Sequence, residues 1–594
     1  MYKKMIVTLV ALIAIACTVL YMKKTGFKLE STKYANIYEA FNLIESDGSQ
    51  MGDDVYAVVV SGILSDYKAV FKNNVYYVRY ETIRNKVNNK FFFDSQEELL
   101  LFTTPTYLVK HKIGGAGYEE NGSEQSWNNE ITLKVNDDLY IDLAFVAKYT
   151  GIGYQVYQNP NRICMIGTFD PLPYATVKKI DSIRNGADVS AHIYEEAKIG
   201  EKVLLTGLEE GDFVEVMTSE GIIGYIKKKS LSDTTQEAEK PKIELPEYTS
   251  LKKDNKVSLA WHQVTNQTAN GTLDDAISGT NGLNVISPTW LSVRKSNGKI
   301  SSIVSSEYVK KAHDKGIDVW VLIDDFKKTK DGNYIVNDVI SKTSSRQRLV
   351  KNIIKQVKSC KADGVNVDFE YIKEENSDSY IEFIRELSIE CRNNKLVLSI
   401  DNYVPSDWSN YYRRADQAEV ADYVVVMAYD EYNVSSDDAG PVSSMKYVEN
   451  GIKNTVDEVG SSNAGKVIAA LPFYTRIWTK EDVKKSSNIS KDAKIVEDAV
   501  NGNYALSSEA VGMDTAKEYV DSHGLSLSLD EESGLNYAYE DKDGVFTQIW
   551  MEDVDSLSSK LDLVNGNGIG GAAFWKLTME SNDVWDVINE KLAN

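Results

Sequence analysis

Cysteine, histidine and proline are scarce in this chain of 594 residues, which has four cysteines, five histidines and ten prolines. Cys17 lies in an apolar N-terminal segment. The spacing of Cys164, Cys360 and Cys391 suggests neither a metal site nor a disulfide framework, so we expect buried apolar thiols. So few histidines also argue against a histidine-rich metal centre and against a histidine-based catalytic triad.

Positive charge is also in short supply, since 66 lysines and arginines face 88 acidic residues and leave a formal net charge of -22. Proteins that bind nucleic acid draw their affinity from clustered Lys and Arg, so no nucleic-acid partner is expected. The hydrophobic share of 42% and the charged share of 26% are those of an ordinary folded protein. The length predicts roughly three to four domains.

Residues 1–26 have the layout of a signal sequence or a membrane anchor. Two lysines lie within residues 1–4, residues 5–22 form an apolar or weakly polar run, and Lys23 and Lys24 close it. The run is long enough to cross a bilayer as a helix and has no convincing cleavage site, which favours an uncleaved anchor. Ordinary cleavage and a lipid on Cys17 stay open. We expect the bulk of the chain at the extracellular face of the membrane or in the cell wall, secreted if cleaved.

Residues 53–168 are expected to form a small β-rich module. Short alternating strands are predicted at 55–60, 75–80, 132–135 and 139–143, with Asn, Asp and Gly turns between them. The passages "NNVYYVRYETIRNKVNN" and "NDDLYIDLAFVAKYTG" share a turn, a strand and a short amphipathic helix. This pattern resembles a bacterial cell-envelope module similar to the N-terminal domain of copper amine oxidases. No copper is implied, because no histidine cluster accompanies it.

Residues 172–232 contain a second set of short strand-like runs, and their ending "DFVEVMTSEGIIGYIKKKSL" resembles a bacterial SH3 domain. The resemblance implies a cell-wall peptide as partner, while a plain spacer between membrane and main domain remains open. Residues 233–255 are charged, contain proline and lack apolar periodicity, so we expect a linker.

Residues 256–594 alternate apolar runs with helical stretches, which predicts parallel strands joined by crossover helices. Eight strands are expected, at 257–261, 285–288, 318–323, 364–370, 396–401, 423–429, 467–473 and 569–575. This is the α/β layout of a (β/α)8 TIM barrel. A doubly wound sheet would place a glycine-rich turn after the first strand, where "AWHQVTNQ" stands. The gap between the seventh and eighth strands is too long for a loop and a helix, so a small α+β insertion is expected at about 488–539.

The segment "DGVNVDFEYI" at 363–372 carries the chemistry. Side chains alternate along a strand, so Asn366, Asp368 and Glu370 share one face while apolar residues share the other. The apolar face must meet the helices, which turns the polar face inward with Glu370 nearest the C-terminal mouth. Two buried carboxyls are costly unless one holds a proton, and a raised pKa suits an acid catalyst. A hydrogen-bonding ladder without catalysis is the alternative.

The same segment resembles the signature of family 18 glycoside hydrolases, a glycine followed by alternating acids that end in a catalytic glutamate. Chitinases carry aspartate where this chain has Asn366. Exported bacterial members that resemble spore-cortex-lytic N-acetylglucosaminidases often have asparagine at this position. The resemblance therefore favours peptidoglycan over crystalline chitin as the substrate. Further segments match that subgroup in order and spacing: "VISPTW", "VVVMAYDEY", "LPFYTRIW", "QIWMEDVDSLSSKLDLV" and "GIGGAAFWKL".

The resemblance implies a retaining glycosidase without a cofactor, in which the 2-acetamido oxygen of the substrate attacks the anomeric carbon and forms an oxazolinium. By resemblance, Glu370 protonates the leaving oxygen and later activates water. Asp368 orients the acetamido group, and Tyr429 donates a hydrogen bond to its oxygen. Asn366 cannot take a proton from Asp368, so we expect its amide to donate a hydrogen bond to that carboxyl.

Aromatic and polar residues at strand ends are the expected sugar contacts. Trp575 would stack under the sugar ring at the cleavage site, or close the barrel as a core residue. The other candidates are Trp261, Trp290, Met427, Asp430 and Tyr474, with Trp478 as a further one. Alternative functions are cleavage of chitin or another N-acetylated glycan, sugar binding without catalysis, and tethering to the wall. The presence of all three residues of the implied mechanism favours an enzyme acting on a polysaccharide.

Overall fold

The computed structural model describes residues 28–484, 489–497, 502–542 and 544–593. The chain separates into two compact units. One consists of Met1–Phe93, Leu100–Phe102 and Lys110–Pro246, and the other of Asp94–Leu99, Thr103–Val109 and Glu247–Asn594. Within the described residues no helix is long and apolar enough to cross a membrane, and the segment expected to do so, 1–26, lies outside them.

The first unit is rich in β structure, as the alternating sequence predicts. One sheet has the order β10-β11-β4-β3-β1-β13-β12, with β2 paired to β1, and a second has the order β16-β15-β19-β18-β17-β14-β20. A five-stranded sheet runs β5-β6-β7-β8-β9. The strands are β1 Val55–Val60, β2 Ile63–Leu64, β3 Ala69–Lys72, β4 Val75–Arg79, β5 Phe91–Asp94, β6 Leu99–Thr103, β7 Leu108–Lys112, β8 Gly117–Glu120, β9 Ser123–Ser126, β10 Thr132–Val135, β11 Asp138–Asp142, β12 Tyr154–Tyr157, β13 Arg162–Met165, β14 Leu172–Thr176, β15 Asp181–Arg184, β16 Ile193–Ala197, β17 Lys202–Glu210, β18 Phe213–Met217, β19 Ile223–Lys227 and β20 Thr235–Glu237.

The segments expected to form two separate β-rich modules share one hydrophobic core. Ala57 and Val59 of β1 pack in the same buried cluster as Val203 of β17 and Val216 of β18. Three short helices, α2 Ile37–Ala40, α3 Tyr80–Lys86 and α4 Leu143–Thr150, complete this unit. The expected linker 233–255 is not without structure throughout. It contains strand β20, which forms because it pairs with β14 at the edge of the second sheet.

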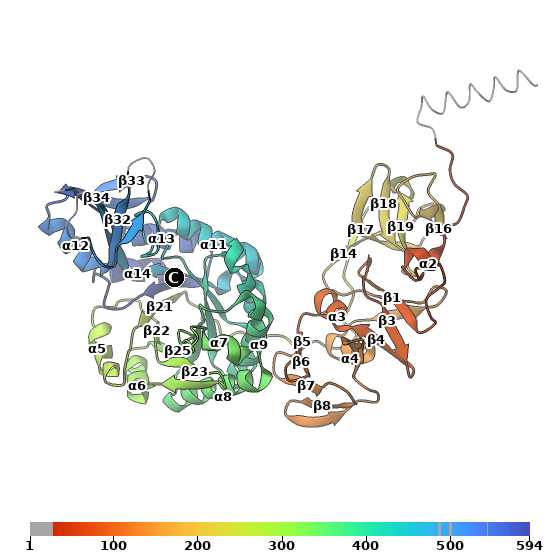
Figure 1. Ribbon diagram of the computed structural model, residues 1–594, viewed down its shortest axis with the longest axis horizontal. Helices are drawn as coiled ribbons and strands as arrows, with labels where there is room; N and C mark the ends of the chain where they lie inside the picture. The colour runs from red at the N-terminus through yellow and green to blue at the C-terminus, as the bar shows by residue number, and fades with distance from the viewer. Residues whose placement is uncertain (1–27, 485–488, 498–501, 543, 594) are drawn as a thin grey trace, which may run out of the picture. The chain divides into compact units, whose positions relative to one another are not determined.

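The second unit is a closed barrel of eight parallel strands, as predicted. The strands follow one another around the barrel in chain order, and closure comes from the pairing of β22 with β25 and of β21 with β36. Figure 1 shows these strands with helices around them. They are β21 Val257–His262, β22 Val285–Pro288, β25 Asp318–Asp324, β26 Gly364–Asp368, β27 Val397–Tyr403, β28 Tyr423–Met427, β29 Val467–Pro472 and β36 Gly571–Trp575.

Two hydrophobic clusters occupy the two faces of the barrel sheet. Inside the barrel, Leu259, Trp320, Val425 and Ile468 belong to one buried cluster. A larger cluster joins the outer face to the surrounding helices. Those helices are α5 Leu273–Ala276, α6 Ser306–Asp314, α7 Ile335–Ile340, α8 Thr343–Cys360, α9 Ser377–Asn394, α10 Arg414–Val420, α11 Met445–Val459, α13 Val554–Gly566 and α14 Val584–Leu592. Cys360 and Cys391 are buried in this layer as free thiols.

An α+β insertion interrupts the barrel between β29 and β36, as expected, but it is longer than 488–539. Its six-stranded sheet begins at Tyr474 and ends at Trp550, because the alternating segments on both sides of the expected range pair with one another. The elements are β30 Tyr474–Asp482, β31 Lys494–Val496, β32 Tyr504–Gly512, α12 Met513–Ser522, β33 Ser528–Asp530, β34 Leu535–Lys542 and β35 Val545–Trp550. A hairpin of β23 Leu291–Lys295 and β24 Lys299–Ser302 follows β22 and extends the barrel sheet beside β25.

Candidate active site

The polar residues of strand β26 point into the barrel, opposite to their apolar neighbours. Val365 and Val367 pack in the outer cluster, whereas Asn366 and Asp368 are buried on the inner side. The strand ends at Asp368, two residues before the expected end. Glu370 therefore lies just past the strand, at the C-terminal mouth, where barrel enzymes hold their catalytic groups.

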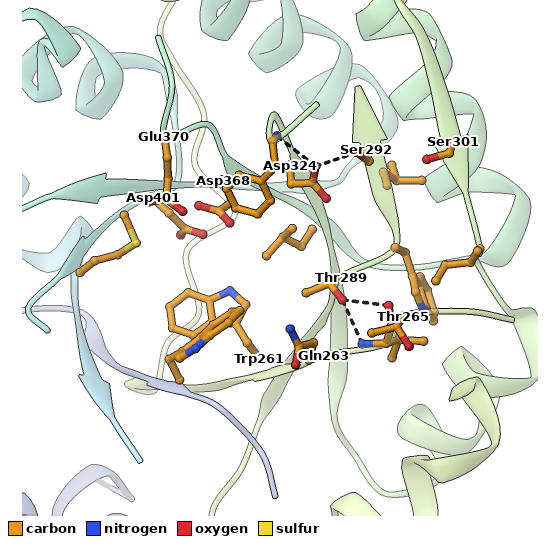
Figure 2. A pocket seen from close by; sticks show the side chains of 18 of the residues that line it. Trp261, Gln263, Thr265, Thr289, Ser292, Ser301, Asp324, Asp368, Glu370 and Asp401 are labelled. Carbon is orange, nitrogen blue, oxygen red and sulfur yellow. Dashed lines mark hydrogen bonds between the residues drawn. The ribbon is translucent and has the colours of Figure 1, made fainter. Parts of the chain in front are cut away.

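A cavity of about 550 Å³ opens at this mouth. Figure 2 shows the carboxyls of Asp368, Glu370 and Asp401 gathered on one side of it, with Trp261 across from them. Asn366 and Tyr474 of the expected site do not line the cavity. The expected residues that do line it are Trp261, Trp290, Asp368, Glu370, Met427, Tyr429, Asp430 and Trp575.

Asn366 uses both ends of its side-chain amide to join four barrel strands. Its Oδ1 accepts hydrogen bonds from Nε1 of Trp261 at 2.9 Å and from Oγ of Ser287 at 3.0 Å. Its Nδ2 donates to Oδ1 of Asp401 at 2.8 Å and to Oγ of Ser399 at 3.1 Å. An amide offers two donors and two acceptor positions, so Asn366 is fully satisfied and its orientation is fixed.

The expected hydrogen bond from Asn366 to Asp368 is therefore wrong, because both amide hydrogens go to the neighbouring strand β27. Oδ1 of Asp368 is buried and has no hydrogen-bond partner within the described part of the chain. Burial raises the pKa of Asp368 well above its usual range, and the nearby carboxyls of Glu370 and Asp401 raise it further. Asp368 is thus a carboxyl that favours its protonated form and still lacks one polar partner.

Glu370 is held from two sides. Its Oε2 accepts a hydrogen bond of 2.8 Å from the hydroxyl of Tyr403 on strand β27. Its backbone N–H donates to Oδ1 of Asp325 at 3.1 Å. Burial raises the pKa of Glu370, the bond from Tyr403 opposes that rise, and the charge of Asp430 adds to it. A glutamate of raised pKa at the mouth of the barrel can act as a general acid.

Asp325 explains why strand β26 ends early. Its second oxygen accepts the N–H of Tyr371 at 2.9 Å, so one buried carboxyl takes two successive backbone donors that would otherwise belong to the sheet. Burial raises the pKa of Asp325 to about 8, against the lowering effect of these two bonds. The carboxyl fixes the backbone that carries Glu370.

Tyr429 and Asp430 follow strand β28 on the next side of the cavity. Tyr429 is partly buried, and burial raises its pKa well above the usual range, so it is a neutral hydrogen-bond donor. Asp430 has a left-handed backbone with φ of 58°. Its Oδ1 accepts a hydrogen bond of 2.6 Å from the hydroxyl of Tyr474, which therefore acts on the cavity through Asp430.

The four candidate tryptophans differ in their surroundings. The rings of Trp261 and Trp575 lie 5.8 Å apart between centroids, and the partly buried Trp575 forms part of the cavity wall. Trp290 borders the cavity but is almost fully buried, with its Nε1 bonded to Asn270 at 2.7 Å. Trp478 does not line the cavity. It packs in the core of the insertion and donates to the carbonyl of Gly440.

Three residues of the site were not among those predicted from the sequence. Asp401 and Tyr403 belong to "LSIDNY", in which Ser399, Asp401 and Tyr403 alternate in the same way as the polar residues of β26. The alternation could have found them. Asp325 follows a strand whose interior, residues 319–323, is apolar, and it acts through backbone bonds, for which the sequence carries no signal.

A closed (β/α)8 barrel with a carboxyl-lined cavity at the C-terminal mouth has the form of a glycoside hydrolase. Residues 234–580 match the model of the family "Glycosyl hydrolases family 18". The match covers more than half of the chain, so the chain belongs to this family and is a glycosidase.

Relatives of this chain are bacterial glycosylases. The chain is 24% identical over 306 residues to the uncharacterized glycosylase YvbX of Bacillus subtilis (strain 168), covering 50% of this chain and 80% of the relative. It is 22% identical over 267 residues to the cortical fragment-lytic enzyme of the same organism, covering 44% of this chain and 56% of that enzyme's length. The chitinase of Chromobacterium violaceum ATCC 12472 matches with a TM-score of 0.47 and 19% identity, over 57% of this chain and 99% of that structure.

Proposed function

We propose that this glycosidase cleaves the N-acetylglucosamine-containing glycan of the bacterial cell wall, peptidoglycan, with retention of configuration. The observation that carries the proposal is Asp368, which lines the cavity and whose buried Oδ1 has no hydrogen-bond partner in the described residues. An unpaired buried acceptor costs stability, and a ligand N–H would relieve that cost. The 2-acetamido group of an N-acetylated sugar offers such an N–H.

The proposed reaction begins with a protonated Glu370. Glu370 gives its proton to the glycosidic oxygen while the acetamido oxygen of the same sugar attacks the anomeric carbon, so that the bond to the leaving sugar breaks as the oxazolinium ring closes. Oδ1 of Asp368 accepts the acetamido N–H and so orients the group for attack. The hydroxyl of Tyr429, kept neutral by its raised pKa, donates to the acetamido oxygen before it attacks.

The second half of the proposed reaction uses Glu370 as a base. Its carboxylate takes a proton from water, the water oxygen attacks the anomeric carbon from the side that the first sugar left, and the acetamido group is restored. The configuration is retained without a covalent bond to the protein. Trp575 supports the sugar ring from below, since an aromatic face suits the C–H face of a pyranose.

The cell wall is proposed as substrate on two grounds. The cortical fragment-lytic enzyme is among the relatives of this chain. Asn366 stands where the chitinase pattern has aspartate, and the resemblance associates this change with wall-lytic members. Chitin is the competing substrate, and the experiment described below separates the two.

The remaining parts of the chain support the same setting. We propose that residues 1–26 place the enzyme at the outer face of the membrane and that residues 172–232 contact wall peptides. Digestion of the chain by protease added to intact cells would test the first point. Calorimetric titration of the full chain with a synthetic wall peptide would test the second, and absence of binding would leave a spacer.

The test is digestion of purified peptidoglycan and of chitin by the full chain and by Glu370→Gln, with products resolved by mass spectrometry. We expect fragments with N-acetylglucosamine at the new reducing end from peptidoglycan, and none from the variant. Release from chitin alone would move the substrate to chitin. Binding of both polymers without release by the folded wild type would contradict catalysis and favour a sugar-binding protein.

A further inference from the structure

Asp401 is a further buried carboxyl of the cavity. It lies on strand β27, is 2% exposed, and lines the same cavity as Asp368 and Glu370. Figure 2 shows its carboxyl on the same side of the cavity as theirs. Asp401 comes from a different strand, so its position does not follow from the polar pattern of β26.

Asn366 fixes Asp401 in this place. Its amide oxygen is committed to donors on strands β21 and β22, Trp261 and Ser287, so the amide nitrogen must point to β27. There it donates to Oδ1 of Asp401 at 2.8 Å. The bond supplies Asp401 with a donor that stabilises its negative charge, whereas Oδ1 of Asp368 has none among the described residues.

The charges around Asp401 are almost all acidic. Of the described residues that line the cavity, Arg294 is the only one with a positive charge. Burial raises the pKa of Asp324, and the charge of Arg294 is among the effects that oppose this rise. Charge interactions link Asp401 to Asp368 and Glu370 of β26 and its end, to Tyr380 of α9 and to Tyr429 after β28. The other acidic residues that line the cavity are Asp324 of β25 and Asp430 after β28. Tyr403 of β27 and Asp325 after β25 contact Glu370.

We infer that Asp401 is a further functional residue, a buried carboxyl that lines the same side of the cavity as Asp368 and Glu370 and whose protonation is coupled to theirs. This inference rests on the proposed function. In such a coupled group, each negative charge makes the neighbouring carboxyls hold their protons more tightly. Asp401 touches neither leaving group nor water in the proposed reaction, and it tunes the residues that do.

The direction of the pKa shifts agrees with this arrangement. Burial raises the pKa of Asp401 to about 8, the bond from Asn366 opposes the rise, and the charge of Glu370 adds to it. The pKa of Asp368 is raised by burial first, then by Glu370, and then by Asp401. Loss of the Asp401 charge should therefore let Asp368 release its proton at lower pH.

The test is Asp401→Asn in the full chain. The variant has the same shape, and its Oδ1 still accepts from Asn366, so a purely structural role would leave the pH profile in place. We expect the profile of kcat on N-acetylated glycan to move to lower pH by about one unit, because the loss of a nearby negative charge lowers the pKa of a carboxyl. A profile that superimposes on that of the wild type would overturn the inference.

The exchange Asn366→Asp with Asp401→Asn is the matched control. It moves the carboxyl across the same hydrogen bond, and the neighbours of position 366 can all donate to it: Trp261 Nε1, Ser287 Oγ and Ser399 Oγ. We expect the exchange to bring the profile back toward that of the wild type. If Asp401→Asn is inactive at every pH, activity of the exchange supports the inference, and inactivity of a folded exchange overturns it.

A measurement without substrate separates this inference from the proposed function. The infrared band of protonated carboxyl groups can be followed with pH in the unliganded chain. We expect the band of Asp401→Asn to disappear at lower pH than that of the wild type. At intermediate pH, the intensity lost should exceed that of the one missing carboxyl group. Loss of only one group, with no shift in the rest, overturns the inference even if the wild type cleaves glycan. If the wild type cleaves no glycan but the shift is seen, the proposed function fails alone.

Discussion

The hydroxyl of Tyr403 lies 2.8 Å from Oε2 of Glu370 and donates a hydrogen bond to it from the neighbouring strand. A donor favours the charged form of a carboxyl, so this bond works against the burial that raises the pKa of Glu370. In the proposed reaction Glu370 must be protonated when the glycan binds. Tyr403 would then help to set the highest pH at which the enzyme works.

Tyr403→Phe should move the basic limb of kcat/KM to higher pH. The phenyl ring keeps the packing but removes the donor, so the pKa of Glu370 rises and the acid stays protonated longer. The pH profile of kcat/KM measures this directly. Tyr539→Phe, at an exposed tyrosine of the insertion, is the control and should leave the profile unchanged. A shift of the basic limb to lower pH in Tyr403→Phe would contradict the assignment of Glu370 as the acid.

Asp325→Asn should lower kcat by roughly tenfold to a hundredfold. Asp325 accepts two successive N–H groups, and an amide would turn a donor toward one of them, at a cost of about 1–3 kcal/mol. The two N–H groups belong to the backbone of Glu370 and Tyr371, so their release should misplace the Glu370 side chain. The loss of activity should therefore appear in kcat more than in KM. Steady-state kinetics on a soluble N-acetylated substrate would measure it.

The neighbour Asp324 provides the comparison for Asp325. Its carboxyl accepts from Oγ of Ser292 at 2.7 Å and does not hold the backbone of Glu370. Asp324→Asn should therefore reduce kcat less than Asp325→Asn. Equal losses in the two variants would show that the backbone clamp is not what matters.

Trp575→Ala should reduce kcat/KM by roughly tenfold, because an aromatic contact contributes about 0.5–1.5 kcal/mol and each 1.4 kcal/mol is a factor of ten. Trp575→Phe keeps an aromatic face and should lose less. Both variants are checked for thermal stability, since Trp575 also packs near Trp261. If both variants lose the same activity and both have a lower Tm, a packing role for Trp575 is favoured over sugar stacking.

The stability of the barrel should fall as the pH rises from about 4 to about 8. Asp325 and Asp401 have pKa values of about 8 in the folded protein against 3.8 in the unfolded chain, so the folded state holds more protons across this window. Where the folded state binds more protons than the unfolded state, the free energy of unfolding falls as the pH rises. Asp401→Asn removes one such group, and its Tm should depend less steeply on pH. Equal slopes in variant and wild type would contradict the raised pKa of Asp401.

Much of the barrel could be predicted because strand and helix periods differ in the sequence. The period of two in 363–372 placed Asn366 and Asp368 inside the barrel, and the strands are those expected to within a few residues at each end. The hydrophobic face of each strand fixes which side chains point inward, because a slip by one residue would turn the apolar side chains away from the helices and the polar ones toward them.

Contacts between strands could not be predicted in the same way. The amide of Asn366 was expected to serve its own strand, but the donors and acceptors of three other strands decide its orientation. The early end of β26 depends on Asp325, which is distant in sequence from Glu370. The extent of the insertion depended on which alternating segments pair, and pairing is a tertiary property.

The insertion leaves and re-enters the barrel through very short junctions. Only Phe473 separates β29 from β30, and only residues 551–553 separate β35 from α13. At the returning junction, Glu552 forms a fully buried ion pair with Lys560 at 2.5 Å. Junctions this short leave the insertion little freedom to move independently of the barrel. Tyr474, the first residue of β30, lies directly after one junction and donates its hydrogen bond to Asp430, so the insertion is tied to the wall of the cavity both by the chain and by this bond.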